Sequence, residues 1–475
     1  MKKRTLLLVI CILLACLIPQ SSQPCTTFYF DDGDQPVFGR NFDWMIGDAL
    51  VIVNKRNVSK TAMVNDSETG ISQPVSWTSQ FGSVTFNMIC RELPMGGINE
   101  AGLVVELMML VDTQYPEPDS RPYTNSLQWI QYQLDNFGTV EEVIASDSQL
   151  RIRGVPADFE SHYLVSDRNG SCASIEFLDG KLVYYANETM PAKVLTNSTY
   201  EESTAFLYEH IGWGGDLQIP QSDSSLDRFV RAADMVKNYD PGASESAVDY
   251  AFDILADVSQ SVFVHTQWSI AYDIKILRIY FHTLENEKIR YIDLSSFDFS
   301  CRTPVKVLDI NEDLSGDISN NFVDYSYEMN RDLIENNYPD MSDEDIDALA
   351  NYPETTICME NCFIATATYG STMEPQVEVL REFRDRFLFD NALGKTFVKL
   401  YNTHSPALAD LIARNDSLRK VVRLGLLPIV GMSWFFLKIG PVPAMLLMIL
   451  LMALISIAAA AVWRKNRNRK IKYER

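Results

Sequence analysis

Short runs of β-branched and aromatic residues, separated by turn residues, fill the first two thirds of the chain. The run 26–30 precedes an Asp- and Gly-rich turn at 31–34, which predicts a strand that leads into a hairpin. The runs 162–166 and 173–177 flank a second turn at 167–170 and predict an antiparallel pair. The pattern therefore predicts a sheet-rich domain.

Helical periodicity interrupts these strands in three places. The segments 126–136, 140–146 and 226–238 repeat apolar residues every three or four positions, and Phe229 and Ala233 share one face of the last segment. Strands and helices are thus interleaved, which is typical of a layered α+β domain. We predict that this domain runs from 25 to about 302.

The composition changes after residue 302. Residues 303–361 are rich in Asp, Glu and Asn, which predicts a solvated, partly helical acidic connector. The next segment, 362–440, contains an amphipathic helix at 377–387 and predicts a small helical region.

Both ends of the chain carry long apolar runs. Residues 1–24 begin with basic residues and continue with an apolar run, the order of a secretory signal. Residues 441–463 carry no charge and are long enough to cross a bilayer core of about 30 Å. The basic tail 464–475 then lies in the cytoplasm by the positive-inside rule. This predicts a single-pass protein of the cell membrane with an extracytoplasmic catalytic domain.

A second apolar stretch at 424–437 is shorter and is bounded by Lys and Arg residues. If it also crossed, the basic tail would lie outside, against the charge rule. One crossing fits better.

The charge of the chain excludes one class of partner. The formal net charge is −22, whereas binding to nucleic acid depends on Lys and Arg at the phosphates. A nucleic-acid partner is therefore not expected.

The chain has eight cysteines, which is sparse for a disulfide scaffold. Cys358 and Cys362 could pair in an exported protein, and the residues around Cys16 offer a lipobox-like alternative for anchoring. No His and Cys spacing indicates a metal, and no cofactor is expected.

Cys25 is the candidate nucleophile, because it directly follows the signal segment. A thiol with its ordinary pKa of ~8.5 needs a base, and none of the five histidines stands in a Cys-His-Asn protease signature. A free α-amine, with a pKa near ~8, can act as that base if Cys25 is residue one. Cys25 would then supply both the nucleophile and the base.

Five separated motifs carry a family resemblance. The chain resembles the choloylglycine hydrolases, the N-terminal-nucleophile (Ntn) family of linear amide hydrolases that includes bile salt hydrolases and penicillin V acylases. The motifs follow in order as CTTF with GRNFDW at 25–44, GINEAGL at 97–103, LTN at 195–197, RFVR at 228–231 and TQWS at 266–269. The resemblance implies a four-layered αββα fold and an enzyme that cleaves a linear non-peptide amide.

It also implies roles around the nucleophile. Cys25 would attack the amide carbonyl, Arg40 would favour its thiolate, and Asp43 would hold the α-amine by accepting a hydrogen bond. A thioester acyl-enzyme would then be hydrolysed by water.

Three further residues receive roles from the same resemblance. Asn197 would offer its side-chain amide to the oxyanion, and Asn99 would complete the oxyanion hole, chiefly through its backbone N–H. Arg228 would steady the site electrostatically.

The residue before Cys25 does not fit a simple signal cleavage. Pro24 is a poor residue for signal peptidase, so a short propeptide removed by Cys25 itself is the alternative. Such autoprocessing is implied by the resemblance.

Structural roles compete with each of these assignments. Cys25 could pair with another cysteine, and Arg40 with Asp43 could form a surface ion pair. Asn99 and Asn197 could be turn residues, and Arg228 a solvated charge on a helix. Tyr163, Trp213 and Trp268 are expected to be core residues, although any of them could line an acyl pocket.

Two other functions stay open. An acyltransferase would use the same nucleophile with an amine or thiol acceptor, and a membrane-anchored binding protein would keep the fold without freeing Cys25. The expected partner is a small-molecule N-acyl amide, and a homo-oligomer is compatible with the sequence. A second resemblance, of 362–371 with 380–385 and 405–406 to the CFI-box C-terminal domain of exported prokaryotic proteins, suggests attachment or sorting.

Overall fold

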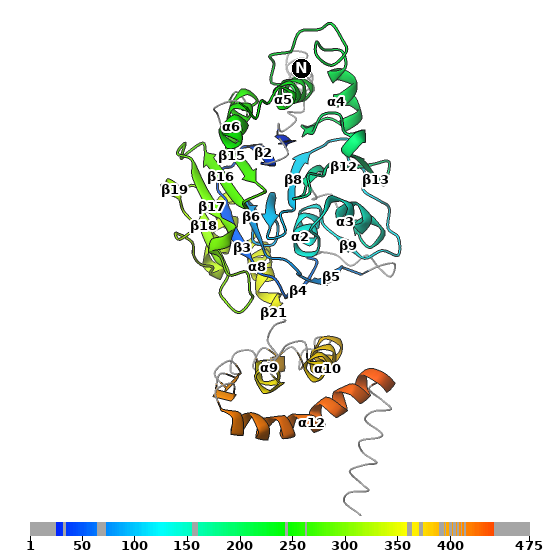
Figure 1. The fold of residues 1–475 in the computed structure, drawn as a ribbon, viewed down its shortest axis with the longest axis vertical. Helices are drawn as coiled ribbons and strands as arrows, with labels where there is room; N and C mark the ends of the chain where they lie inside the picture. The colour runs from blue at the N-terminus through cyan, green and yellow to red at the C-terminus, as the bar shows by residue number, and fades with distance from the viewer. Residues whose placement is uncertain are drawn as a thin grey trace, which may run out of the picture. The chain divides into compact units, whose positions relative to one another are not determined.

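The chain divides into two compact units, Met1–Cys358 and Met359–Arg475. The computed structural model describes residues 25–31, 35–63, 73–153, 160–242, 246–261 and 264–358 of the first unit (Figure 1). In the second unit it describes 363–369, 374–388, several residues between 394 and 412, and 415–440. The predicted signal, membrane helix and basic tail lie outside these residues.

The first unit is built around two large sheets. The seven-stranded sheet has the order β14 (Val194–Leu195), β1 (Thr26–Phe30), β2 (Val37–Trp44), β15 (His265–Asp273), β16 (Arg278–Thr283), β17 (Arg290–Asp293), β19 (Gly316–Asp317). The nine-stranded sheet has the order β13 (Lys181–Ala186), β12 (Cys172–Leu178), β11 (Ser161–Ser166), β8 (Val104–Met109), β7 (Gly96–Asn99), β6 (Ser83–Asn87), β3 (Leu50–Asn54), β18 (Lys306–Asp309), β20 (Val323–Asp324). Apart from β17 with β19, neighbouring strands pair antiparallel.

Smaller elements complete this unit. The short strands are β9 (Tyr123–Thr124) with β10 (Arg151–Ile152), and β21 (Ile357–Cys358) with β4 (Val58–Thr61) and β5 (Ser76–Thr78). The helices are α2 (Ser126–Asn136), α3 (Val140–Ala145), α4 (Tyr200–Leu207), α5 (Ser225–Lys237), α6 (Ala247–Asp257), α7 (Tyr327–Asn337) and α8 (Asp343–Asn351). Single 3-10 turns lie at η1 (Ser146–Ser148), η2 (Asn187–Thr189), η3 (Leu294–Ser296) and η4 (Tyr352–Thr355).

The two sheets face each other through their side chains. Thr27 of β1 contacts Met108 of β8, and Tyr272 of β15 donates a hydrogen bond to Glu106 of β8. Helices α5 and α6 pack on β1, β2 and β15, whereas α2 and α3 pack on β7, β8 and β12 (Figure 1). The layers therefore run helix, sheet, sheet, helix, as the family resemblance implied.

The predicted elements of the sheet-rich domain are confirmed where the apolar pattern was strongest. β1 and α2 have the predicted bounds, and α5 covers 225–237 of the predicted 226–238. Both helices begin at a capping side chain, since Asn125 accepts a hydrogen bond from the Gln128 N–H and Ser224 accepts one from the Asp227 N–H.

The structure revises the predicted acidic connector at 303–361. β18 extends the nine-stranded sheet by pairing with β3, and Leu333 and Ile334 of α7 are buried. A disulfide joins Cys301 to Cys358, so the predicted pairing of Cys358 with Cys362 is wrong. The acidic residues mark the solvent side of packed elements, and the first unit extends to Cys358.

The second unit is helical in its described parts. It contains α9 (Phe363–Tyr369), α10 (Pro375–Phe383), a π-helix (Arg384–Leu388) and α12 (Asp416–Ile439), which carries Pro428 inside it. The apolar stretch 424–437 is part of α12, whose segment Leu418–Lys438 is long and apolar enough to cross a membrane by length and composition.

Candidate active site

Cys25 directly precedes β1 and is only 3% exposed. Thr27 pairs with Arg40 of β2, and alternate residues of a strand point to the same face. The Cys25 thiol therefore shares the face of Thr27, Arg40 and Phe42, which is turned toward the nine-stranded sheet. Cys25, Cys90 and Cys172 are free thiols and Cys301 bonds to Cys358, so Cys25 forms no disulfide with any cysteine in the described part of the chain.

The main chain of Cys25 is held from the opposite side. Its N–H donates to Asn197 Oδ1 at 2.7 Å, and its carbonyl accepts from Arg228 Nη1 at 2.6 Å. In the full-length chain this nitrogen is still the peptide nitrogen of the bond to Pro24. Two of the predicted site residues thus bind the two main-chain groups of the predicted nucleophile.

Arg228 lies in the first turn of α5 and is fully buried. Besides the Cys25 carbonyl it contacts Thr26 Oγ1 at 2.6 Å, Asn197 Oδ1 at 2.9 Å and the Asp223 carbonyl at 3.1 Å. Burial lowers the pKa of Arg228 from its ordinary value, because desolvation disfavours the charged form. Arg228 is therefore a buried anchor of the site and not a solvated helix charge.

Asn197 is fixed by four hydrogen bonds. Its Oδ1 accepts from Cys25 and Arg228, its Nδ2 donates to the Met109 carbonyl at 3.0 Å, and its backbone N–H donates to Ser225 Oγ at 2.9 Å. These partners define the orientation of the amide, because two donors require its oxygen. One hydrogen of the side-chain NH₂ is used by Met109, and the amide carries a second.

Asp43 is buried in β2 close to Arg228. Thr266 of β15 donates to Asp43 Oδ1 at 2.5 Å, whereas Asp43 Oδ2 has no hydrogen-bond partner among the described residues. Burial raises the pKa of Asp43 to about 7, although Arg228 and Thr266 favour the ionised form. In this structure the Cys25 N–H bonds to Asn197 and not to Asp43.

Arg40 carries the charge that acts most strongly on the thiol. Burial raises the pKa of the Cys25 thiol, and Arg40 is the largest charge that opposes this rise. Arg40 is not an isolated cation, because its guanidinium forms a buried ion pair with Glu106. Its Nη1 also donates to the Met95 carbonyl at 3.0 Å.

The structure places Asn99 in the β7–β8 turn, with its backbone N–H and its side-chain amide hydrogen-bonded to neighbouring residues. Its backbone N–H donates to the Leu103 carbonyl at 3.0 Å, and its Nδ2 donates to the Leu134 and Phe137 carbonyls at 2.8 and 2.7 Å. Its Oδ1 accepts from the Ala101 and Leu103 N–H groups at 3.0 Å each. Asn99 closes the β7–β8 turn and fastens it to α2, which is the turn role that competed with the catalytic one.

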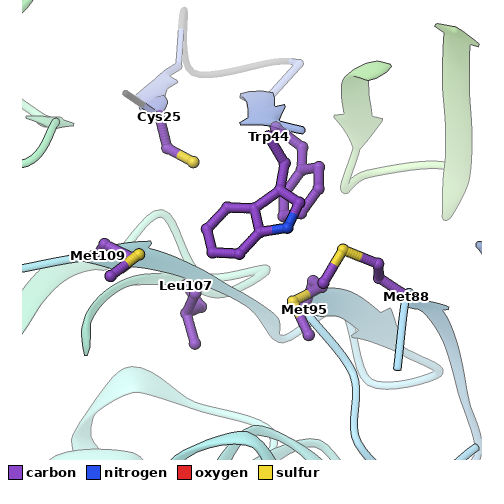
Figure 2. Close-up of a pocket in the computed structure, with 7 residues that line it drawn as sticks. Cys25, Trp44, Met88, Met95, Leu107 and Met109 are labelled. Carbon is purple, nitrogen blue, oxygen red and sulfur yellow. The ribbon is translucent and has the colours of Figure 1, made fainter. Parts of the chain in front are cut away.

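An apolar pocket opens at the Cys25 thiol. In Figure 2 the sulfur points toward the Trp44 ring, and Met88 and Met95 lie on the far side of that ring. Met88 and Met95 are buried, whereas Trp44 and Met109 are half-buried. The other lining residues are Phe42 and Leu107. Trp268 stacks on Phe42 at 3.9 Å behind the pocket wall and, like Tyr163, is a core residue.

No group of three or more His, Cys, Asp or Glu side chains in the described part of the chain is arranged to hold a metal ion.

The model of the linear amide C–N hydrolases of the choloylglycine hydrolase family matches residues 25–307, more than half of the chain. The chain belongs to this family. The resemblance drawn from the five motifs is thereby confirmed, and the match begins at Cys25 itself.

Individual relatives agree with the family assignment. A penicillin V acylase from Pectobacterium atrosepticum is 28% identical over 323 residues, which cover 59% of this chain and 84% of that protein. The structure of penicillin V acylase from Agrobacterium tumefaciens matches with a TM-score of 0.56 and 27% identity, over 64% of this chain and 98% of that one. A variant of conjugated bile acid hydrolase from Clostridium perfringens, at 23% identity and a TM-score of 0.51 over 61% and 98% of the two chains, shares the fold.

Several residues of this family member's site were missed in the sequence. Thr266 and Trp44 lie in quoted motifs but received no role, and Met88 and Met95 gave no signal beyond ordinary apolar positions. Glu106 had a signal, since it is a single acidic residue in an otherwise apolar strand. Its partner Tyr272 lies 166 residues away in sequence, which hides the contact.

Proposed function

We propose that this protein is a cysteine amidase that hydrolyses a linear, non-peptide N-acyl amide through Cys25. The proposal rests on how Cys25 is bound. Its N–H donates to Asn197 and its carbonyl accepts from Arg228, while its thiol faces an apolar pocket. A residue fixed on both main-chain sides presents its side chain in one orientation, as a nucleophile requires.

The α-amine of Cys25 is the proposed base, which requires cleavage of the bond between Pro24 and Cys25. The peptide nitrogen has one hydrogen, and Asn197 accepts it. A freed amine has more hydrogens, and the unpartnered, buried Asp43 Oδ2 is a suitable acceptor for one of them. The unpaired Asp43 Oδ2 therefore supports a site that binds the free α-amine of the processed N-terminus.

In the proposed reaction the amine takes the thiol proton, and the Cys25 sulfur attacks the substrate carbonyl. The proton then passes to the leaving amine as the C–N bond breaks, which leaves a thioester on Cys25. Water attacks this thioester and releases the acid and the free thiol. The second amide hydrogen of Asn197 is the proposed oxyanion donor, a contact typically worth ~3 kcal/mol.

The pocket indicates the chemistry of the acyl group. Its lining consists of methionine, leucine and aromatic side chains together with Cys25. Methionine side chains are unbranched and adapt to different apolar shapes. We therefore propose an apolar acyl group, aromatic or aliphatic, which is consistent with similarity to penicillin V acylases.

We further propose that the first unit lies outside the cytoplasmic membrane, anchored by the apolar segment 441–463 with the tail 464–475 inside. The Cys301–Cys358 disulfide supports an oxidising compartment for the first unit. The segment Leu418–Lys438 of α12 is a second candidate span by length and composition.

The first test is the N-terminal residue of the purified mature protein, mapped by mass spectrometry in wild type and in Cys25→Ala. We expect free Cys25 in wild type, retained upstream residues in the variant, and turnover of N-acyl amides by wild type alone. A wild-type chain that begins upstream of Cys25 would contradict the amidase and favour a non-catalytic binding protein. Product analysis with an added acceptor amine separates hydrolysis from acyl transfer.

A further inference from the structure

Glu106 occupies a buried position that the proposed reaction does not use. Its side chain is 1% exposed and lies in the interface between the two sheets. One carboxylate oxygen contacts the Arg40 guanidinium, and the other accepts a hydrogen bond from the Tyr272 hydroxyl at 2.5 Å. The three side chains come from β8, β2 and β15, so the contact joins the nine-stranded sheet to two adjacent strands of the seven-stranded sheet.

The neighbouring strand β7 makes room for this contact. Gly96 is paired with Glu106, and a Cβ atom at Gly96 would lie 1.9 Å from Glu106 Oε2. Any larger residue at 96 would displace the carboxylate. The carbonyl of the preceding residue, Met95, accepts a hydrogen bond from Arg40 Nη1 at 3.0 Å. Residues 95 and 96 at the start of β7 thus accommodate the ion pair between Arg40 and Glu106.

The Cys25 thiol lies among few charges. Burial raises the pKa of the thiol, Arg40 and Arg228 lower it, and the Asp43 carboxylate raises it. The charged and titratable groups that act on these three charges are Glu106 from β8, Tyr272 from β15, Arg231 from α5 and Asp223 from the segment before α5. Arg40 is the largest of the lowering charges, so whatever compensates Arg40 also alters the thiol.

We propose that Glu106, held by Tyr272, is a positioning residue that fixes the Arg40 guanidinium near Cys25 and limits how strongly its charge favours the thiolate. This inference rests on the proposed role of Cys25 as nucleophile. It assigns two separable effects to Glu106, one through its charge and one through the length and hydrogen bonding of its side chain.

Glu106→Gln tests the effect of the charge. The variant keeps the shape and an acceptor for Arg40 but removes the negative charge, so the Arg40 charge acts on the thiol without compensation. We expect the pH midpoint of Cys25 alkylation by iodoacetamide, followed by peptide mass in the full-length protein, to fall by about one pH unit. The matched control is Glu100→Gln, which removes a carboxylate paired with Arg56 at the β7–β8 turn and should leave the midpoint unchanged. An unchanged midpoint in folded Glu106→Gln would overturn the proposal.

Glu106→Asp and Tyr272→Phe test the positioning effect, and they decide the matter if Glu106→Gln does not fold. Glu106→Asp keeps the charge on a shorter side chain, so kcat should fall about tenfold while KM and the alkylation midpoint stay near wild type. Tyr272→Phe removes one hydrogen bond and should lower kcat about threefold. KM should hold in both variants because neither residue lines the pocket. Wild-type kcat in both variants would refute the positioning role.

The alkylation measurement needs no substrate. If wild type hydrolyses no amide, the proposed function fails, and the alkylation midpoints still decide whether Glu106 acts on Cys25.

Discussion

The two faces of β2 differ in chemistry although their residues alternate along one strand. Asn41 and Asp43 face α5 and α6, where Asn41 donates to the Leu255 carbonyl at 2.7 Å and Asp43 lies beside Arg228. Arg40, Phe42 and Trp44 face the nine-stranded sheet, and two of them line the pocket. The main chain of Cys25 is bound on the helix-facing side, whereas its thiol lies on the sheet-facing side. Substitutions on the two faces should therefore produce different defects.

The largest effect is expected from Arg228→Met on the helix-facing side. The variant removes the contacts to Cys25, Thr26 and Asn197 and leaves Asp43 buried without its cation. We expect kcat/KM to fall at least ~10³-fold and the free energy of unfolding to fall by ~3 kcal/mol. Arg231→Met, one turn along α5, is the matched control because Arg231 pairs with Asp257 at 2.9 Å. Similar activity losses in both variants would contradict a specific role for Arg228.

The pKa of Asp43 predicts a pH-dependent stability in the uncleaved chain. Its pKa is about 7 in the folded state, whereas an unfolded Asp has a pKa near ~3.9. The native state binds the proton more tightly between these values, so this contribution is full below about pH 4 and is lost as pH rises through about 7, by up to ~4 kcal/mol. In Cys25→Ala the melting temperature should therefore fall over this range.

Asp43→Asn in the Cys25→Ala background should reduce that fall, because Asn does not titrate. The melting temperatures of the two proteins are compared by calorimetry from pH 4 to 8. An equal fall in both would show that Asp43 is not the group responsible. In processed wild type a nearby α-ammonium should lower the pKa of Asp43 and reduce the fall as well.

A smaller effect is expected at Thr266, the hydrogen-bond donor to Asp43. Thr266→Val should lower kcat/KM about tenfold, because a hydrogen bond to a charged group is worth ~1.5–3 kcal/mol. Loss of the donor raises the pKa of Asp43 further, so the acid limb of the pH–rate profile should move to higher pH. Thr266→Ser keeps the hydroxyl and should restore both values. If the pH–rate profile is the same in wild type and in both variants, Asp43 takes no part in the reaction.

On the sheet-facing side we expect a change in substrate preference and not a loss of the reaction itself. Met95→Ala enlarges the pocket and should shift the preference among N-acyl amides toward larger acyl groups by about tenfold, with a stability cost of ~2–5 kcal/mol. Met95→Leu, of similar volume, should retain the wild-type preference. Equal kcat/KM ratios across an acyl series in wild type and Met95→Ala would show that this pocket does not bind the acyl group.

Most of the candidate site was predictable because its residues stand in short motifs. Cys25, Arg40 and Asp43 fall within 19 residues of the sequence, and the motifs at 195–197 and 228–231 supplied Asn197 and Arg228. For Asn99 the motif alone does not show whether the residue serves a turn or the reaction. In the structure three hydrogen bonds made by the N–H and the side-chain oxygen of Asn99 close the turn, and two more from its side-chain nitrogen fasten it to the end of α2.

The acidic segment after residue 302 shows a similar limit for the fold. Its charge count predicted a connector, yet β18 pairs with β3 across more than 250 positions, and Cys301 bonds to Cys358. Short strands with one buried face carry too weak a local pattern to reveal such distant pairing.

The sequence by itself determined the family, the candidate nucleophile, the main strands and helices, and four of the residues around Cys25, because these depend on local periodicity and on motifs. Only the tertiary structure decided which side of β2 each residue serves, that Glu106 compensates Arg40, and that methionines and aromatic residues line the pocket. The reason is physical. Burial, charge compensation and pocket shape arise between side chains of strands that lie far apart in the sequence, such as Glu106 and Tyr272.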